Sequence, residues 1–427
     1  MNISPKTILL GIIGLIVLAV VLIITGVIPG LRPPQAFKTE LSMWGLEDDS
    51  AAWKSVIAAY QVQNSRISIN YTGFSIEEYE QRLVDALAAG TGPDIFMFHN
   101  NWLLKHKNKI FAAPAEVATP ITVSELFPQV VTQDFIADNQ VYALPISIDT
   151  LALLYNKNIF DAKQIPVATS SWEEIHRVIP ILREVADGSL SKPAIALGGS
   201  EAQVRNATDI LSLIMMQFGA MIVNPQELRA VFSSSGFGLQ GLNFYLSFSD
   251  PLNASYSWNE KFGDSITAFL NGGTAMVFAY NSDIKEIRSK NPILNFGVLP
   301  FPQLKSDFPV NLPSYWGLAV SNKTRYYADS WYFISSATTD INMSRNYINI
   351  SGNPPALRTL INDFLTNPNL KVFAAQALTA KNWPHPDPSG VRSVFDNMIK
   401  LSLANRTQSN QFLVQAQDEI NKLLQRR

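Results

Sequence analysis

The chain has 427 residues, 47% of them hydrophobic and 16% charged, so it has ample material for a core and a length typical of two or three domains. The formal net charge is −2 and there is no strongly basic block, which argues against a nucleic-acid partner, because phosphate neutralisation needs clustered Lys and Arg. The chain has no cysteine, which excludes disulfides, thiolate ligands, a cysteine nucleophile and a lipidated N-terminal cysteine, and its 4 histidines lack metal-site spacing, so we expect no metal and no cofactor.

An apolar run without a charged residue extends from Ile8 to Leu31. As a helix it would measure roughly 36 Å, more than the ~30 Å hydrocarbon core of a bilayer. The alternative is a cleaved signal peptide, but its apolar region would be shorter, and Pro29 to Pro34 offers no small-residue cleavage site. We therefore expect residues 1–36 to form a transmembrane helix, kept as a membrane anchor, and a spacer. The rest of the chain would then be extracytoplasmic, at the cell surface or in the periplasm.

Short strands alternate with amphipathic helices after residue 36, a pattern typical of an α/β fold. The first part of this pattern predicts a strand over 41–44, a helix capped by Asp48 to Ser50, a strand over 67–71, a helix from the capping box at Ser75 to Gly90, and a strand over 94–98. Later strands are predicted over 151–155, 275–279, 296–299 and 318–321, with helices after Ser171 and Thr407.

Five segments, in a fixed order, are similar to segments of a known family. They are Trp-Gly at 44–45, Leu-Ala-Ala-Gly-Thr-Gly-Pro-Asp-Ile at 87–95, Val-Tyr-Ala-Leu-Pro at 141–145 with Leu-Tyr-Asn-Lys-Asn-Ile-Phe at 154–160, Phe-Leu-Asn-Gly-Gly-Thr-Ala-Met at 269–276, and Gly-Asn-Pro-Pro-Ala at 352–356. Together they resemble the family 1 extracellular solute-binding proteins, the maltose-binding-protein-like group of ABC transporter substrate-binding proteins.

The resemblance implies a two-lobed, periplasmic-binding-protein-like fold of type II, whose inter-lobe cleft binds a ligand by hinge closure. It places chain crossings near Ser147, Tyr280 and Ser335, with residues 37–146 and 281–334 in lobe 1 and residues 147–280 and 335–427 in lobe 2. It also implies a monomer that captures a small polar solute, a sugar or an oligosaccharide, for an ABC permease in the membrane.

Other functions stay open on the sequence alone. A tethered ligand-binding sensor component would use the same lobes, and the solute could be a phosphodiester or a peptide instead of a sugar. An extracellular hydrolase is not indicated, because the chain lacks a Gly-x-Ser-x-Gly motif and its acidic pairs stand at predicted helix starts. We therefore expect no enzymatic activity and no catalytic residues.

Sugar recognition needs aromatic rings that stack on the apolar faces of the ligand, and carboxylates or amides that orient its hydroxyls. The resemblance implies that the loops after the early strands and the first crossing face the cleft, which makes candidates of Trp44, Glu47, Asn101, Trp102 and Asp149. Later loops add Trp258, Tyr280, Tyr315, Trp316 and Trp383. The alternatives are a strand-end core position for Trp44, a surface charge for Asp149, and loop packing for Trp258 and Trp383. Many sugar-binding relatives have a Trp near position 282, which this chain lacks, so Tyr280 is the candidate substitute.

Overall fold

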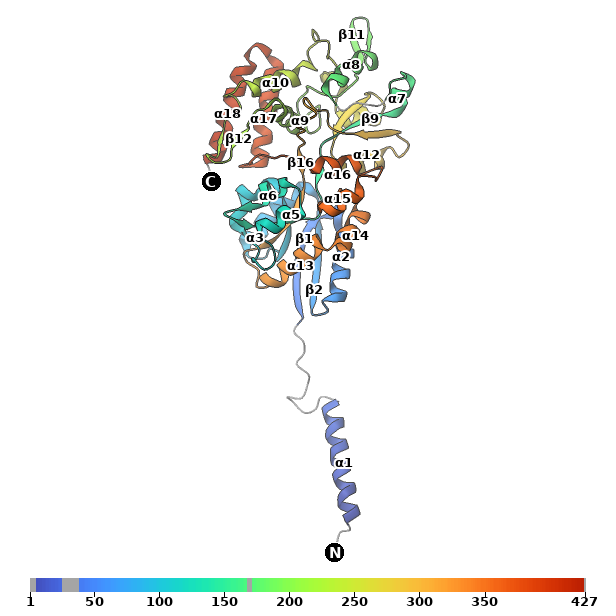
Figure 1. Ribbon diagram of the computed structural model, residues 1–427, viewed down its shortest axis with the longest axis vertical. Helices are drawn as coiled ribbons and strands as arrows, with labels where there is room; N and C mark the ends of the chain where they lie inside the picture. The colour runs from blue at the N-terminus through green and yellow to red at the C-terminus, as the bar shows by residue number, and fades with distance from the viewer. Residues whose placement is uncertain (1–4, 25–37, 167–170, 426–427) are drawn as a thin grey trace.

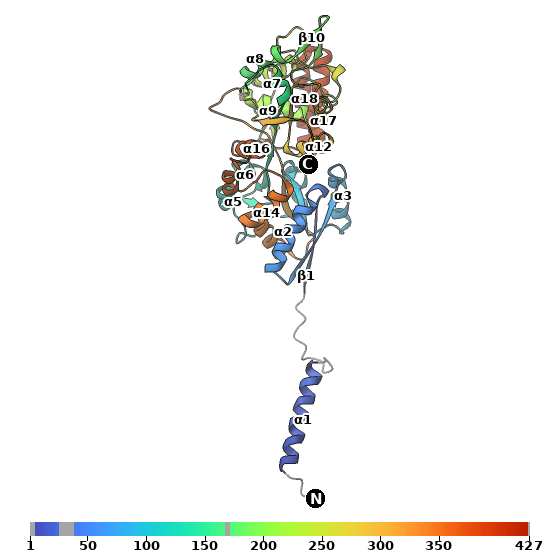
Figure 2. The ribbon, with the colours of Figure 1, turned by 90° about the vertical axis from the view of Figure 1, so that its right-hand side faces the viewer.

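The computed structural model describes residues 5–24, 38–166 and 171–425. Figure 1 shows two lobes, one around β1 and β2 and the other around β9, α17 and α18. Figure 2, turned by 90°, keeps the same division, with α2, α3 and α14 in one lobe and α9, α17 and α18 in the other. The predicted α/β architecture with two lobes is therefore confirmed.

The N-terminal helix α1 runs over Pro5–Ile24. The predicted membrane-spanning segment continues to Leu31, and its residues 25–31 lie outside the described part of the chain. Within residues 5–24, 38–166 and 171–425, no helix has the length and apolarity required to cross a membrane. The structure thus does not support the predicted transmembrane anchor.

The first lobe is built on a mixed sheet with strand order β2-β1-β3-β17-β4, in which β7 also pairs with β17. β1 is parallel to β2 and β3, whereas β17 is antiparallel to β3, β4 and β7. The strands are β1 Thr39–Leu46, β2 Ile67–Phe74, β3 Ile95–His99, β4 Ile110–Phe111, β7 Leu144–Pro145 and β17 Trp316–Ser321, with a hairpin of β5 Ile136–Ala137 and β6 Gln140–Val141. The helices are α2 Ser50–Gln63, α3 Ile76–Ala89, α4 Leu103–His106, α5 Pro120–Leu126, α6 Gln129–Phe135, α13 Tyr327–Thr339 and α14 Ile341–Ser351.

Local sequence signals explain most of these elements. The predicted apolar face of α2 is buried, and Gly90 ends α3 in the left-handed conformation at φ 73°. Ser75 stands at the N-cap of α3, but its side chain makes no capping hydrogen bond, so the predicted capping box is wrong there. Asp94, at the start of β3, accepts hydrogen bonds from the backbone N–H and hydroxyl of Ser42, both at 2.8 Å. It therefore joins β3 to β1.

The second lobe has a three-stranded antiparallel sheet with the order β14-β9-β15. Its central strand is buried at every residue, which explains why its sequence is a continuous apolar run. The strands are β9 Ala152–Asn156, β14 Met276–Ala279 and β15 Phe296–Leu299, with hairpins of β10 Glu184–Ala186 and β11 Ser189–Lys192, and of β12 Val223–Asn224 and β13 Arg229–Ala230. The helices are α7 Lys157–Ala162, α8 Trp172–Leu182, α9 Ala207–Phe218, α10 Phe237–Ser247, α11 Ser265–Leu270, α12 Asn281–Lys290, α17 Pro388–Ala404 and α18 Ser409–Gln425.

Three connections between the lobes lie side by side. β8 (Asp149–Thr150) pairs with β16 (Pro313–Ser314), so the first and second connections form a two-stranded ribbon. The third follows α15 (Arg358–Phe364) and α16 (Lys371–Ala377), and it runs beside the second, because the Lys381 N–H donates to the Asn311 carbonyl at 2.9 Å.

Two predicted lobe boundaries differ from these connections. β15 falls in the segment 281–334 assigned to lobe 1, but it pairs with β9 in the second lobe. α14 falls in the segment 335–427 assigned to lobe 2, but it packs on α2 in the first lobe. The apolar pattern of a strand or helix does not say which of two cores buries it, which is why the sequence misplaced both elements.

Candidate functional site

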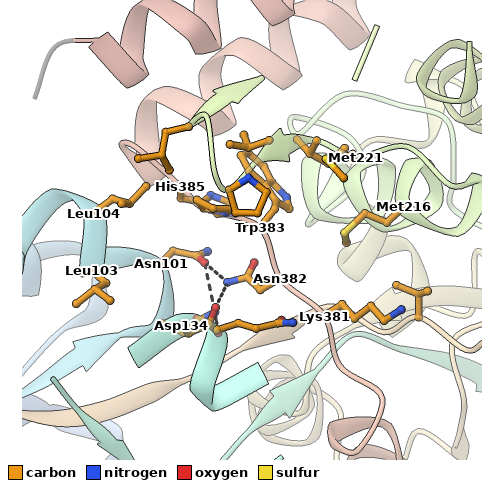
Figure 3. Close-up of a pocket in the computed structure, with 18 of the residues that line it drawn as sticks. Asn101, Leu103, Leu104, Asp134, Met216, Met221, Lys381, Asn382, Trp383 and His385 are labelled. Carbon is orange, nitrogen blue, oxygen red and sulfur yellow. Dashed lines mark hydrogen bonds between the residues drawn. The ribbon is translucent and has the colours of Figure 1, made fainter. Parts of the chain in front are cut away.

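A cavity of about 600 Å³ lies where the two lobes meet the third connection, a size typical of small-molecule sites. Figure 3 shows side chains of this cavity arranged around the connecting residues 381–385. The first lobe contributes residues of α4, α6 and β5, and the second contributes the end of α9 and the hairpin that follows it.

A hydrogen-bonded cluster of polar side chains forms one part of this cavity wall. The Asn382 amide donates to Asn101 Oδ1 at 2.7 Å and to Asp134 Oδ1 at 2.8 Å (Figure 3). On its other oxygen, Asp134 accepts from the Tyr315 hydroxyl at 2.8 Å and the Asn100 amide at 3.2 Å. This cluster ties the third connection to the first lobe.

Burial raises the pKa of Asp134 to about 7, although the hydrogen bonds from Asn382, Tyr315 and Asn100 favour the carboxylate and oppose that rise. Near neutral pH the cavity wall therefore holds an acid that can be either protonated or ionised.

A second cavity, of about 180 Å³, adjoins the first. Four residues, Asn101, Asn382, Trp383 and His385, line both cavities. Its other polar wall residues come from both lobes and the connecting ribbon: His99 from the first lobe, Ser314 from the ribbon, and Thr208, Asp209, Ser212 and Arg392 from the second lobe. We call it the polar cavity, and the 600 Å³ cavity the large cavity.

Opposite charges meet in the polar cavity. Burial raises the pKa of Asp209, while the nearby Arg392 guanidinium lowers it. The Tyr280 hydroxyl donates to Asp209 Oδ2 at 2.9 Å and so orients the carboxylate. His99 Nδ1 accepts the Asn101 N–H at 3.3 Å, and burial lowers the pKa of His99 to about 4, so this ring is neutral at pH 7.

Trp383 and His385 form the wall between the two cavities. The Trp383 indole donates to Ser212 Oγ at 2.8 Å, and its ring stacks on His385 with centroids 3.8 Å apart. His385 is only 8% exposed, and among the described residues neither of its ring nitrogens has a hydrogen-bond partner. Burial lowers its pKa to about 3, so the imidazole is neutral.

Four of the predicted site residues lie on or directly behind these walls. Asn101 and Trp383 line both cavities. Tyr280 and Tyr315 are buried behind them, where each hydroxyl holds a wall carboxylate. Trp316 lies one layer further back, with its ring edge-on to His99 at 4.8 Å.

The other predicted residues are not among the described residues that line either cavity. Trp44 contacts the Phe74 ring at 4.7 Å, and Trp102 stacks on Tyr79 at 6.1 Å in the core of the first lobe. Trp258 is fully buried in the second lobe. Glu47 is exposed in a short 3-10 helix, Glu47–Asp49. These aromatic side chains are used for packing.

Asp149 has a structural role instead of the predicted ligand contact. Its oxygens accept the backbone N–H groups of Thr150 at 2.7 Å and of Asn281 and Ser282 at 3.0 Å. It therefore fixes the start of α12 to the ribbon that joins the lobes, and burial raises its pKa to about 7.

Sequence reasoning missed several wall residues, namely His99, Asp134, Asp209, Asn382, His385 and Arg392. A signal existed for Asp134, because it shares the buried face of α6 with Val130, Val131 and Phe135, where an acid needs a partner. His385 stands between two prolines in an aperiodic segment, which carries no such signal. Among the described residues, no group of three or more His, Cys, Asp and Glu side chains could hold a metal ion.

The family profile described as "Bacterial extracellular solute-binding protein" matches residues 44–343. Curated relatives are distant. A "Putative binding protein" of Brucella abortus is 22% identical over 256 residues, which cover 58% of this chain and 59% of that relative, so the chain spans less than two thirds of the relative's length. The "Galactooligosaccharide-binding protein" of Bacillus subtilis is 23% identical over 152 residues, covering 35% of this chain and 34% of that protein.

Solved structures share the fold over most of the chain. The cyclic alpha-maltosyl-1,6-maltose binding protein of Arthrobacter globiformis has a TM-score of 0.76 at 17% identity, covering 90% of this chain and 99% of that one. The sugar-binding protein MalE of Xanthomonas citri has a TM-score of 0.74 at 16% identity, with 91% and 98% covered.

Proposed function

The chain belongs to the bacterial extracellular solute-binding protein family, and we propose that it captures a sugar or an oligosaccharide outside the cytoplasm for an ABC importer. The observation that carries the ligand class is the polar cavity, where His99 of the first lobe and Ser314 of the connecting ribbon meet Asp209 and Arg392 of the second lobe. A polyol needs many donors and acceptors at fixed positions, and charged planar groups are the strongest of these.

The charge balance of the polar cavity favours a neutral ligand over an anionic one. Arg392 Nη1 lies 3.9 Å from a Glu201 oxygen, and Asp209 also interacts with Arg392 electrostatically. These two acidic side chains compete with a phosphodiester for the one guanidinium, whereas hydroxyl groups can bridge the opposite charges.

Relatives support the same ligand class. Similar proteins include a galactooligosaccharide-binding protein and a maltotriose-binding protein, and a solved structure similar in fold is a cyclo/maltodextrin-binding protein complexed with maltotetraose. We infer that the protein acts as a monomer. We also infer that it binds and releases its solute unchanged, because the cavities offer polar contacts from two lobes that can separate at the connecting ribbon.

A thermal-shift panel of monosaccharides and oligosaccharides on the full chain tests this function. A sugar at 100 times its Kd should add about 2.7 kcal/mol to the free energy of unfolding, by mass action on the folded state. Peptides and glycerol phosphodiesters serve as comparison ligands. If these raise the melting temperature and no sugar does, the proposed ligand class is wrong.

A further inference from the structure

The large cavity is apolar beyond its polar cluster. Figure 3 shows Leu103 and Leu104 of the first lobe on one side of the connecting residues, and Met216 and Met221 of the second lobe on the other. Ile136 and Leu228 extend this lining. Such walls offer a sugar ring few hydrogen bonds, so they fit a different chemical group.

The large cavity has a volume of about 600 Å³, which is the size of a site for a small organic molecule. Met221 is 55% exposed although it is apolar, so part of this lining meets solvent. Methionine side chains are flexible and polarizable, and they adapt to ligands of varied shape. The lining therefore suits a flexible hydrocarbon group.

Unsatisfied polar atoms stand where the large cavity meets the polar cavity. Among the described residues, Asn382 Oδ1 and both ring nitrogens of His385 are buried without a hydrogen-bond partner. Both residues line both cavities. Leaving such atoms unpaired is costly, which points to hydroxyl or ether groups of a ligand at this junction.

We propose that the large cavity binds the apolar substituent of a glycoside, an alkyl or aryl group, while the sugar ring of the same ligand occupies the polar cavity. Asn382 Oδ1 then accepts a hydrogen bond from a sugar hydroxyl, and the neutral His385 ring donates from one nitrogen and accepts at the other, at the glycosidic end of the sugar. This inference rests on the proposed sugar-binding function and narrows its substrate class to glycosides with a hydrophobic aglycone.

Titration calorimetry with methyl, butyl and hexyl glycosides of glucose, galactose, mannose and maltose tests the proposal on the full chain. Affinity should rise roughly two- to fourfold for each added methylene, because each is removed from water in the large cavity. Equal affinities for the methyl and hexyl members of a binding series would overturn it.

A double variant, Met216→Gln with Met221→Gln, keeps the side-chain length and removes the apolar surface. It should reduce the hexyl-to-methyl affinity ratio to below threefold, and circular dichroism reports whether the variant is folded. The control is Leu252→Gln, which should keep the wild-type affinity ratio, because Leu252 is 97% exposed and is not among the described residues that line either cavity. A ratio that survives the double variant would refute the assigned cavity. If no sugar and no glycoside binds the wild-type chain, the proposed function itself fails, so the two failures are distinguishable.

Discussion

Replacing Asp134 by asparagine should change how the stability of the protein depends on pH. Burial sets the folded-state pKa of Asp134 at about 7, against an ordinary value of 3.8. Because the folded-state pKa is the higher one, ionising this acid is harder in the folded state. The contribution of the buried, protonated Asp134 to the free energy of unfolding is therefore fully present below about pH 4, and it is lost as the pH rises through 7.

The pKa difference of about three pH units corresponds to at most roughly 4 kcal/mol in the free energy of unfolding. The variant Asp134→Asn cannot ionise, and its oxygen can still accept from Tyr315 and Asn100. Its NH₂ group can donate to Asn382 Oδ1 only if the Asn382 amide turns over, which removes the Asn382 donation to Asn101. That cost does not depend on pH, so the pH dependence of the difference still reports the titration of Asp134.

Urea denaturation from pH 4 to pH 8, followed by tryptophan fluorescence, measures this effect. The difference in unfolding free energy between the wild-type protein and Asp134→Asn should favour the variant progressively as the pH rises, by up to about 4 kcal/mol over this range. The difference cancels the titration of all other groups. A constant difference across the range would show that Asp134 titrates normally and that its burial does not control its charge.

Three further predictions concern the connecting ribbon, an ion pair between the lobes and the N-terminal segment. In the same assay, the difference in unfolding free energy should shift in favour of Asp149→Asn as the pH rises from 4 to 8, because burial raises the pKa of Asp149 to about 7. The amide NH₂ that replaces one acceptor of the Asn281 and Ser282 N–H groups should cost the variant about 1–3 kcal/mol at every pH, and a difference that does not change with pH would contradict this. Asp387→Asn should weaken sugar affinity two- to fivefold at low salt, because the ion pair of Lys105 and Asp387 at 2.8 Å links α4 of the first lobe to the start of α17 in the second. The effect should be smaller at 1 M NaCl, which screens the pair. The control Arg82→Gln breaks an ion pair within α3 and should leave the sugar affinity unchanged. Deleting residues 1–36 should leave the sugar Kd unchanged, because β1 begins at Thr39 and the described cavity walls begin at residue 76, so a large rise in Kd would refute this separation.

Local structure was largely predictable, because it depends on signals that are near one another in the sequence. The buried stripe of α18 (Leu413, Ala416, Ile420 and Leu424) follows from helical spacing, and the continuous apolar run of β9 follows from burial on both faces. The family resemblance added the two lobes, which periodicity alone does not give.

The site was less predictable, because its residues come from several segments that are far apart in the sequence. Tryptophans are frequent in sugar sites, yet Trp102 and Trp258 are packed in the cores, and the sequence does not distinguish these uses. Asp209 and Arg392 lie on α9 and α17, and only the fold of the second lobe brings them together at one cavity.

The account rests on a polyol held in the polar cavity between the lobes. Titration calorimetry of the sugar that gives the largest thermal shift, against the wild-type chain and Asp209→Asn, tests this most directly. The substitution keeps an oxygen for the Tyr280 hydroxyl and removes the charge that would orient ligand hydroxyls. We predict an affinity roughly ten- to a hundredfold weaker, measured on a variant whose circular dichroism shows that it is folded, since a hydrogen bond to a charged group contributes about 1.5–3 kcal/mol. Equal affinity in the two proteins would contradict the location of the sugar.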